Sequence, residues 1–197
     1  MTLYIARHGE TDFNAEDRIQ GSGKDLSVLS QRGVQQAIAL GKSLENVDFD
    51  AVYSSPLRRA VDTVKHAFGN KYEPILDKRL IEIGLGEMEG MLASEAAAAF
   101  PESSKSWPNP AEYIPPPGGE ALEDMVARVD AFLEDIRQTG HRKVLVLTHG
   151  YTLRVFYACT VDKSLEAIGY APRYKNCEVV RYKYMNDEWR MFQHENL

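Results

Sequence analysis

Short, nearly unbroken apolar runs, each followed by polar residues, are the feature of this sequence that most restricts its fold. The clearest runs are "TLYIA" (2–6), "FDAVYSS" (49–55) and "KVLVLTHG" (143–150). Runs of this length with so little polar interruption are typical of strands buried on both faces of a sheet. Because segments with helical periodicity separate them, the pattern predicts an α/β fold with a largely parallel sheet.

Helical periodicity lies between the predicted strands, with a capping serine before the first helix and a proline in the first turn of the second. The clearest helix begins at Ala121, where acidic residues occupy the first turn and one apolar stripe follows. The predicted helices cover residues 30–45, 57–68, 94–100, 121–136 and 151–160, and further strands are predicted at 73–77, 178–185 and 188–193.

Length, charge and cysteine count limit the class of protein. A chain of 197 residues suits one domain with a full core. The net charge of -6 argues against non-specific nucleic-acid binding, which needs a basic face. One pair of cysteines is not a disulfide framework, so we expect reduced thiols. Because the sequence has neither a signal peptide nor a membrane-spanning apolar run, we expect a soluble, cytoplasmic protein that binds no membrane.

Distinctive polar residues follow three of the predicted strands. Arg7-His8-Gly9 follows the first, Arg58-Arg59 follows the second, and His149-Gly150 ends the third. In a parallel sheet these ends lie on one edge, where open α/β sheets bind their ligands. Glu82 lies in a glycine-containing loop, 78–90, that is expected close to this edge.

This set of side chains suits phosphoryl transfer. Guanidinium groups pair with phosphate oxygens in bidentate geometry and keep their charge. A neutral imidazole can attack phosphorus, and a nearby carboxylic acid can protonate the leaving oxygen and then deprotonate water. Glycines after the histidines let backbone N–H groups approach the anion. The sequence therefore predicts a phosphate site at the carboxyl edge of the sheet.

Six ordered blocks resemble the histidine phosphatase superfamily, the group that includes phosphoglycerate mutases. The most specific is "ARHGETDFN", which is similar to the family pattern R-H-G-E-[ST]-x-x-N. The others are "RIQG", "VYSSPLRRAVDT", "RLIEIGLGEMEG", "PPGGEALEDMVARV" and "VLVLTHGYTLRVF". The resemblance implies one histidine phosphatase domain over 1–197, with a lid-like insertion at about 91–118. It also implies a three-layer α/β/α sandwich with a mostly parallel, mixed sheet of about six strands.

The resemblance implies three catalytic residues. His8 matches the nucleophile that becomes phosphorylated, and Glu82 matches the proton donor. His149 matches the second histidine, which binds and polarises the phosphate. Glu87 and Glu89 lie close to Glu82 in the sequence and remain alternatives as the general acid.

The resemblance also implies the residues that hold the phosphate. Arg7 and Arg59 match the two phosphate-binding arginines, and Arg59 is preferred to Arg58 because the family's arginine directly precedes an alanine. Thr11 and Asn14 match polar groups of the same pocket. The resemblance implies no metal and no cofactor.

The preferred function is a metal-independent phosphatase that hydrolyses a small phosphorylated metabolite through a phosphohistidine. The main alternative is a cofactor-dependent phosphoglycerate mutase, which passes the phosphoryl group to a hydroxyl instead of water. The family's mutases tend to be longer, and "PPPGGEAL" is more similar to its phosphatase branches. A catalytically silent binder of phosphorylated ligands ranks lower because nucleophile and acid are both present. A dinucleotide-binding oxidoreductase is disfavoured because Gly21-Ser22-Gly23 does not lie between a strand and a helix.

The expected partner is a small-molecule phosphate ester, and the sequence does not identify it. We expect the walls of the substrate pocket to come from the "GSGKD" loop (21–25) and from about 91–118. Both stretches are irregular. The oligomeric state stays open, with a homodimer as one candidate.

Overall fold

A six-stranded sheet lies at the centre of the computed structural model, which describes residues 1–24 and 26–195. Asp25 of the "GSGKD" loop therefore lies outside the described residues. The strand order is β3-β2-β4-β1-β5-β6. The first four strands in this order are parallel to one another, β5 pairs antiparallel with β1, and β6 pairs antiparallel with β5. The strands are β1 (Thr2–Arg7), β2 (Ala51–Ser54), β3 (Ile75–Leu76), β4 (Lys143–Thr148), β5 (Val179–Met185) and β6 (Glu188–Glu195).

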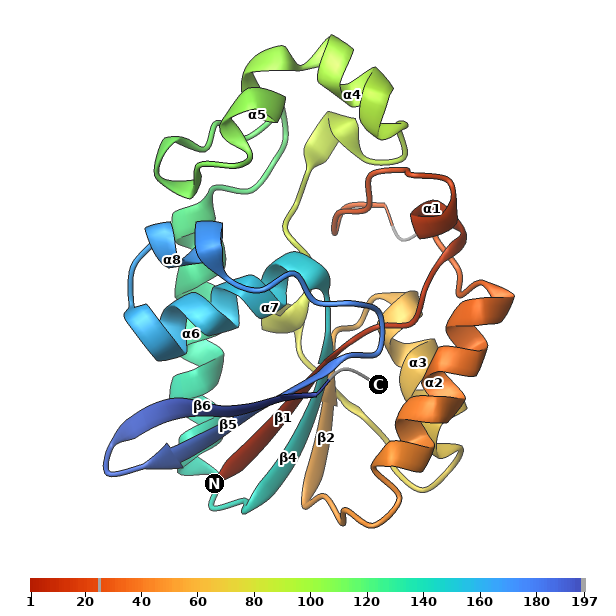
Figure 1. The fold of residues 1–197 in the computed structure, drawn as a ribbon, viewed down its shortest axis with the longest axis vertical. Coiled ribbons are helices and arrows are strands. Elements are labelled where there is room, and N and C mark those ends of the chain that lie inside the picture. The colour runs from red at the N-terminus through yellow and green to blue at the C-terminus, as the bar shows by residue number, and fades with distance from the viewer. Residues whose placement is uncertain (25, 196–197) are drawn as a thin grey trace.

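Helices cover both faces of this sheet (Figure 1). On one face lie α2 (Gln31–Ser43) and α3 (Arg58–Phe68), and on the other α6 (Leu122–Gln138) and α7 (Gly150–Tyr157). The predicted three-layer α/β/α sandwich with a mostly parallel, mixed sheet is confirmed. Helix α2 begins where the sequence predicts, because the Ser30 hydroxyl caps it by accepting the N–H of Gly33.

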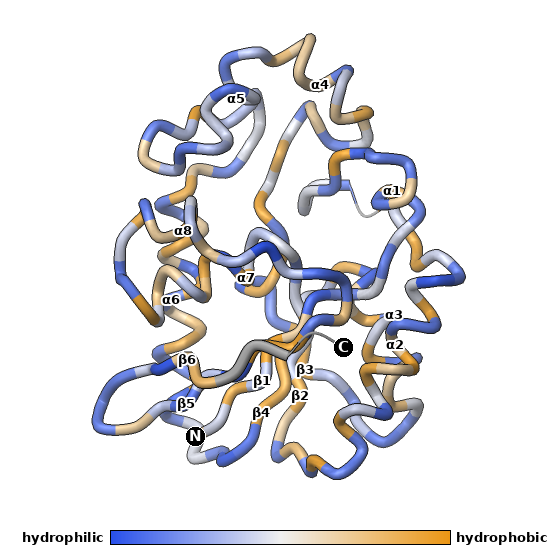
Figure 2. Tube along the Cα trace, viewed as in Figure 1, coloured by the Kyte–Doolittle hydropathy of each residue, from blue (hydrophilic) through white to orange (hydrophobic). Residues whose placement is uncertain are grey.

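Alternate residues of the central strands divide the core between the two faces. Leu3 and Ile5 pack against the α6–α7 layer, whereas Tyr4 and Ala6 pack against the α2–α3 layer. Because both faces are covered, the strands are apolar throughout rather than on every second residue. Figure 2 shows this as a hydrophobic trace through much of β2 and β4.

The chain between β3 and α6 lies beyond the carboxyl edge of the sheet (Figure 1). It contains η1 (Lys78–Leu80), η2 (Gly86–Met88), α4 (Ala93–Ala99), α5 (Pro101–Ser106) and η3 (Pro110–Glu112). α4 was predicted, but α5 lies in a proline-containing stretch for which no helix was predicted. Pro101 occupies its first turn, where the missing N–H breaks no intrahelical bond. The assignment of this segment as a lid-like insertion within one domain stays a prediction.

Three further short elements were not predicted as separate units: α1 (Asp12–Ala15), the π-helical η4 (Ala158–Asp162) and α8 (Glu166–Tyr170). Helices of this length carry too little periodicity to identify, and α1 depends on a capping box at its N-terminus. Both cysteines are free thiols, as expected. Within the described part of the chain, every helix is too short or too polar to cross a membrane.

Candidate active site

Parallel pairing of β1 with β4 brings two histidines together at the carboxyl edge of the sheet. Arg7 is in register with Thr148, so His8 and His149 follow directly on neighbouring strands. The His8 N–H donates to the Thr148 carbonyl at 3.0 Å, and the centroids of the two imidazole rings lie 5.1 Å apart. Both side chains are buried. The predicted meeting of these strand ends is therefore observed.

One hydrogen bond fixes the orientation of the His8 ring. Its Nδ1 lies 2.7 Å from the Gly9 carbonyl oxygen, which can only accept a hydrogen bond. A neutral ring therefore carries its proton on Nδ1 and keeps a lone pair on Nε2. Close packing requires a glycine at position 9, because a Cβ there would lie 2.6 Å from the Gly33 carbonyl oxygen.

The His149 ring is held on both sides. Arg59 Nε donates to its Nδ1 at 3.1 Å, and its Nε2 lies 2.7 Å from Ser55 Oγ. Because a guanidinium group is a donor only, the proton of a neutral His149 ring is on Nε2 and is donated to Ser55. Both ring nitrogens are thus engaged within the protein. A contact between His149 and a phosphate requires one of these partners to move.

Of the adjacent arginines on α3, Arg59 points into the site and Arg58 points away. Arg59 is 1% exposed and its Nη2 donates to the Gly21 carbonyl at 3.0 Å. Arg58 is exposed, and its Nε donates to Asp62 at 3.2 Å. The placement matches the preference for Arg59, whose role as a phosphate ligand stays a prediction.

Arg7 lies at the end of β1 beside the same histidines. Its Nη1 donates to the Tyr174 carbonyl at 2.8 Å, while its Nε is buried without a hydrogen-bond partner among the described residues. Burial lowers the pKa of the Arg7 guanidinium, and the negative charge of Glu82 opposes that shift. An arginine stays protonated in proteins, so Arg7 supplies a fixed positive charge.

Burial and positive charge keep both imidazoles neutral. Desolvation lowers the pKa of His8 well below its ordinary value of 6.5, and the charges of Arg59 and Arg7 lower it further. The pKa of His149 is lowered well below 6.5 for the same reasons, with desolvation again the largest cause. The His8 Nε2 lone pair is therefore available at neutral pH.

Glu82 is held at the N-terminus of α7, the helix that His149 caps. Its Oε1 accepts the N–H groups of Ile83 and Thr152, and its Oε2 accepts the N–H of Tyr151, each at 3.1 Å. The helix dipole favours a carboxylate in this position. Among the described residues, Oε2 accepts only that one hydrogen bond, which leaves it the better placed oxygen for exchanging a proton.

The two other glutamates of this loop occupy different environments. Glu87 is exposed. Glu89 is 5% exposed, and its carboxylate accepts the N–H groups of Ser22, Gly23, Lys24 and Leu85 at 2.8–3.1 Å. Glu89 therefore anchors the loop that begins at Gly21, the residue whose carbonyl holds Arg59. Of the three candidates, Glu82 is the one bonded to the histidine-capped helix.

Thr11 and Asn14 are brought to the edge of the site by α1. The Thr11 hydroxyl accepts the Asn14 N–H at 3.1 Å and donates to Gln20 Oε1 at 2.9 Å. Asn14 Oδ1 accepts the Thr11 N–H at 3.2 Å. The two residues therefore form the cap of α1, and their contact with a phosphate stays a prediction.

Three residues of the site were not singled out from the sequence. Ser55 holds His149, Gln20 binds Thr11, and Thr63 accepts the Gly9 N–H. All three lie within "RIQG" or "VYSSPLRRAVDT", so these two blocks identified the segments but not the individual residues. Glu89 was considered as an acid, and its contact with the loop at 22–24 was not predicted. The contacts of Ser55, Thr63 and Glu89 join residues more than fifty positions apart, so no local pattern indicates them.

The side chains of the site suit chemistry on a phosphoryl group. Two guanidinium groups can neutralise the charge of a phosphate, a neutral imidazole can attack its phosphorus, and a carboxyl group can protonate a leaving oxygen. Among the described residues, no cluster of three or more His, Cys, Asp or Glu side chains is arranged to hold a metal ion.

Comparison with known proteins places this arrangement in a family. The family model described as the histidine phosphatase superfamily (branch 1) matches residues 3–196. Phosphoserine phosphatase 1 of Hydrogenobacter thermophilus is 34% identical over 167 residues, which cover 84% of this chain and 78% of the relative. The 2,3-bisphosphoglycerate-dependent phosphoglycerate mutase of Rhizobium etli is 36% identical over 162 residues, which cover 78% of this chain and 76% of the relative.

A solved structure supports the same placement. YhfR of Bacillus stearothermophilus superposes with a TM-score of 0.87 at 34% sequence identity, over 96% of this chain and 94% of the other. Sequence and fold thus agree over nearly the whole chain.

The neutral histidines predict a pH dependence of stability. In the unfolded chain His8 takes up a proton below about pH 6.5, whereas the buried ring does not. The free energy of unfolding should therefore have its full value above about pH 6.5. As the pH falls below 6.5 it should decrease, by up to about 1.4 kcal/mol per pH unit for each buried neutral histidine. Urea unfolding at pH 7.5, 6.5 and 5.5 measures this, and His8→Gln should show a shallower loss than His66→Gln, which alters an exposed histidine. Equal slopes in the two variants would contradict the buried, neutral state of His8.

The Glu89 anchor predicts a stability difference between neighbouring glutamates. Glu89→Ala leaves the backbone N–H groups of 22–24 without their acceptor and should lower the free energy of unfolding by about 2–3 kcal/mol. Glu87→Ala, at an exposed position, should change it by less than about 0.5 kcal/mol. Chemical denaturation gives the two values, and hydrogen exchange at 22–24 should accelerate only in Glu89→Ala. Unchanged exchange there would show that Glu89 does not hold this loop.

Proposed function

We propose that this chain, which belongs to the histidine phosphatase superfamily, is a metal-independent phosphatase that hydrolyses a small phosphorylated metabolite through a phosphohistidine on His8. Family membership and the phosphatases among its relatives support phosphoric monoester hydrolase activity. The observation that carries the finer proposal is the buried, neutral His8 ring. Its Nδ1 is tied to Gly9, and two arginines lie beside it.

In the first step His8 Nε2 attacks the phosphorus of the ester. The N–P bond forms as the bond between phosphorus and the ester oxygen breaks. Glu82, which enters this step in its protonated form, gives its proton to the departing alkoxide and becomes a carboxylate. In the second step the Glu82 carboxylate removes a proton from water, whose oxygen attacks the phosphorus and breaks the N–P bond. Inorganic phosphate leaves, and His8 and Glu82 return to their starting states.

The remaining site residues stabilise the phosphoryl group in both steps. Arg7 and Arg59 neutralise the charge on its non-bridging oxygens as it moves between the two nucleophiles. His149, with Thr11 and Asn14, completes the pocket. Arg59 now donates to His149, so binding of the phosphate exchanges this neutral acceptor for a dianionic one, which forms stronger charge-assisted hydrogen bonds.

The first test is hydrolysis of p-nitrophenyl phosphate with and without EDTA. We expect full activity in EDTA and a loss of roughly a thousandfold or more in kcat for His8→Ala. His66→Ala, an exposed histidine on α3, is the matched control and should retain activity. Loss of activity in EDTA would contradict the metal-free mechanism, and an active His8→Ala enzyme would contradict the nucleophile assignment.

A burst experiment separates the two proposed roles of Glu82, general acid in the first step and general base in the second. p-Nitrophenol leaves without protonation, so Glu82→Gln should still release it rapidly in the first turnover. The steady-state rate should fall by about 10²–10⁴-fold, because water is no longer activated. Rapid-quench kinetics measure both phases. A full steady-state rate in Glu82→Gln, together with a slow Glu87→Gln, would move the acid–base role to Glu87.

Phosphoglycerate mutase activity is the second candidate, favoured by the mutase among the relatives. Its chemistry is identical until the phosphoenzyme meets a substrate hydroxyl instead of water. An assay of 3-phosphoglycerate primed with bisphosphoglycerate distinguishes the two. We expect slow release of inorganic phosphate without appreciable 2-phosphoglycerate, and rapid formation of 2-phosphoglycerate would establish the mutase.

A further inference from the structure

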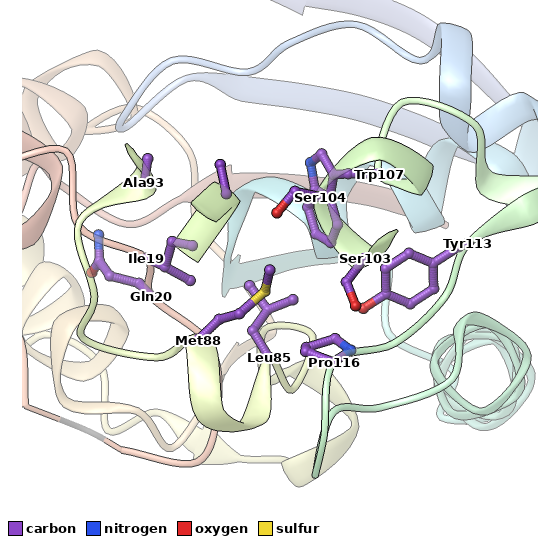
Figure 3. Close-up of a pocket in the computed structure, with 11 residues that line it drawn as sticks. Ile19, Gln20, Leu85, Met88, Ala93, Ser103, Ser104, Trp107, Tyr113 and Pro116 are labelled. Atoms are coloured by element: carbon purple, nitrogen blue, oxygen red, sulfur yellow. The ribbon is translucent and has the colours of Figure 1, made fainter. Parts of the chain in front are cut away.

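A cavity of about 340 Å³ lies between the segment that carries α4 and α5 and the loops at the carboxyl edge of the sheet (Figure 3). Its volume is at the lower end of the range for small-molecule sites, about 300–1,000 Å³. Ile19, Leu85 and Met88 line one side, and the rings of Trp107 and Tyr113 line another. Among the described residues, none that lines this cavity carries a formal charge.

The cavity is joined to the candidate active site through two sets of contacts. Gln20 lines it, accepts a hydrogen bond from Thr11, and precedes the glycine whose carbonyl holds Arg59. On the other side, the Trp107 ring packs on the Tyr151 ring with centroids 4.6 Å apart, and the Tyr151 N–H donates to Glu82. Two residues that line the cavity therefore contact neighbours of the candidate active site: Gln20 binds Thr11, and Trp107 packs on Tyr151, whose N–H binds Glu82.

Tyr113 lines the cavity and carries a buried hydroxyl group. Its ring packs against Trp107 at 5.6 Å between centroids, and its hydroxyl oxygen is buried without a hydrogen-bond partner among the described residues. A buried phenol without a partner is uncommon and costs free energy unless something binds to it. A mostly apolar pocket with a few polar groups is typical of a small-molecule site, and none of the described residues that line this one is charged.

We infer that this cavity binds the alcohol part of the phosphate ester, and that the alcohol is uncharged, largely apolar and large enough to carry a ring. The inference rests on the proposed phosphatase function and names its substrate class. A second phosphate, a carboxylate or an ammonium group would be desolvated against apolar side chains without an opposite charge to pair with it. Esters that carry such groups are therefore expected to be poor substrates.

Two aliphatic esters with similar leaving groups test this directly. Ethyl phosphate and 2-phenylethyl phosphate both release primary alcohols, so a difference in kcat/KM reports the contact with the added group. Each buried methylene is worth about fourfold. We expect 2-phenylethyl phosphate to exceed ethyl phosphate by at least about tenfold, and O-phosphoserine and 3-phosphoglycerate to be no better than ethyl phosphate. Equal values for the two neutral esters, or a preference for a charged one, would overturn the inference.

Variants locate the preference in this cavity. Ser104→Lys places a cation among the lining residues and should reduce kcat/KM for 2-phenylethyl phosphate about tenfold, while ethyl phosphate changes less than about twofold. Trp107→Leu should diminish the preference, and Trp107→Phe, which keeps a ring, should retain most of it. Trp189→Leu, on β6 outside the cavity, is the matched control and should leave the preference unchanged. An unchanged preference in both Ser104→Lys and Trp107→Leu would overturn the assignment to this cavity.

Binding to an inactive variant separates failure of this inference from failure of the proposed function. If no ester is hydrolysed, the phosphatase proposal is wrong. Calorimetry with His8→Ala still compares the dissociation constants of ethyl and 2-phenylethyl phosphate. Tighter binding of 2-phenylethyl phosphate by at least about tenfold supports the apolar cavity whatever the chemistry. Equal binding contradicts it even if hydrolysis is fast.

Discussion

The parallel register of β1 with β4 is the constraint on which the rest of the site depends. Arg7 pairs with Thr148, so His8 and His149 leave neighbouring strands at the same level, and the His8 N–H continues the ladder. A shift of one residue would turn each side chain toward the opposite face. The division of the core holds this register, because alternate residues of both strands are buried against different helix layers.

Burial and the positive charges of the nearby arginines act on the two histidines in the same direction. Both lower the pKa values of the two histidines, so the imidazoles are neutral where a nucleophile is needed. The hydrogen bond from Nδ1 to Gly9 then leaves the lone pair of His8 on Nε2, the nitrogen proposed to attack. Arg59 donates to the Gly21 carbonyl, and Glu89 holds the loop that follows Gly21, so Glu89 supports the position of Arg59 without contacting the histidines. The described residues that line the proposed substrate cavity are uncharged, and Gln20 and Trp107 connect them to this charged edge through Thr11 and Tyr151.

Much of this arrangement could be predicted from the sequence, and there are physical reasons why the remaining elements and contacts could not. Strands buried on both faces are apolar throughout, so "TLYIA" and "KVLVLT" indicate strands, and the polar residues that follow them mark the edge where the candidate site lies. By contrast, α5 lies among prolines, and α1 exists because of its cap. The contacts of Ser55 and Glu89 join residues more than sixty positions apart. The sequence identified candidate glutamates, but only the packed loop distinguishes the exposed Glu87, the anchoring Glu89 and the helix-bound Glu82.

In the proposed mechanism, the Nε2 atom of His8 receives the phosphoryl group. Phosphoenzyme formed on Glu82→Gln, in protein labelled with ¹⁵N at histidine, allows this to be measured by ³¹P–¹⁵N NMR. We expect a phosphoramidate whose phosphorus is coupled to the Nε2 of His8, with Nδ1 still protonated. Coupling to Nδ1, attachment at another residue, or the absence of any phosphorus–nitrogen bond during turnover would contradict it.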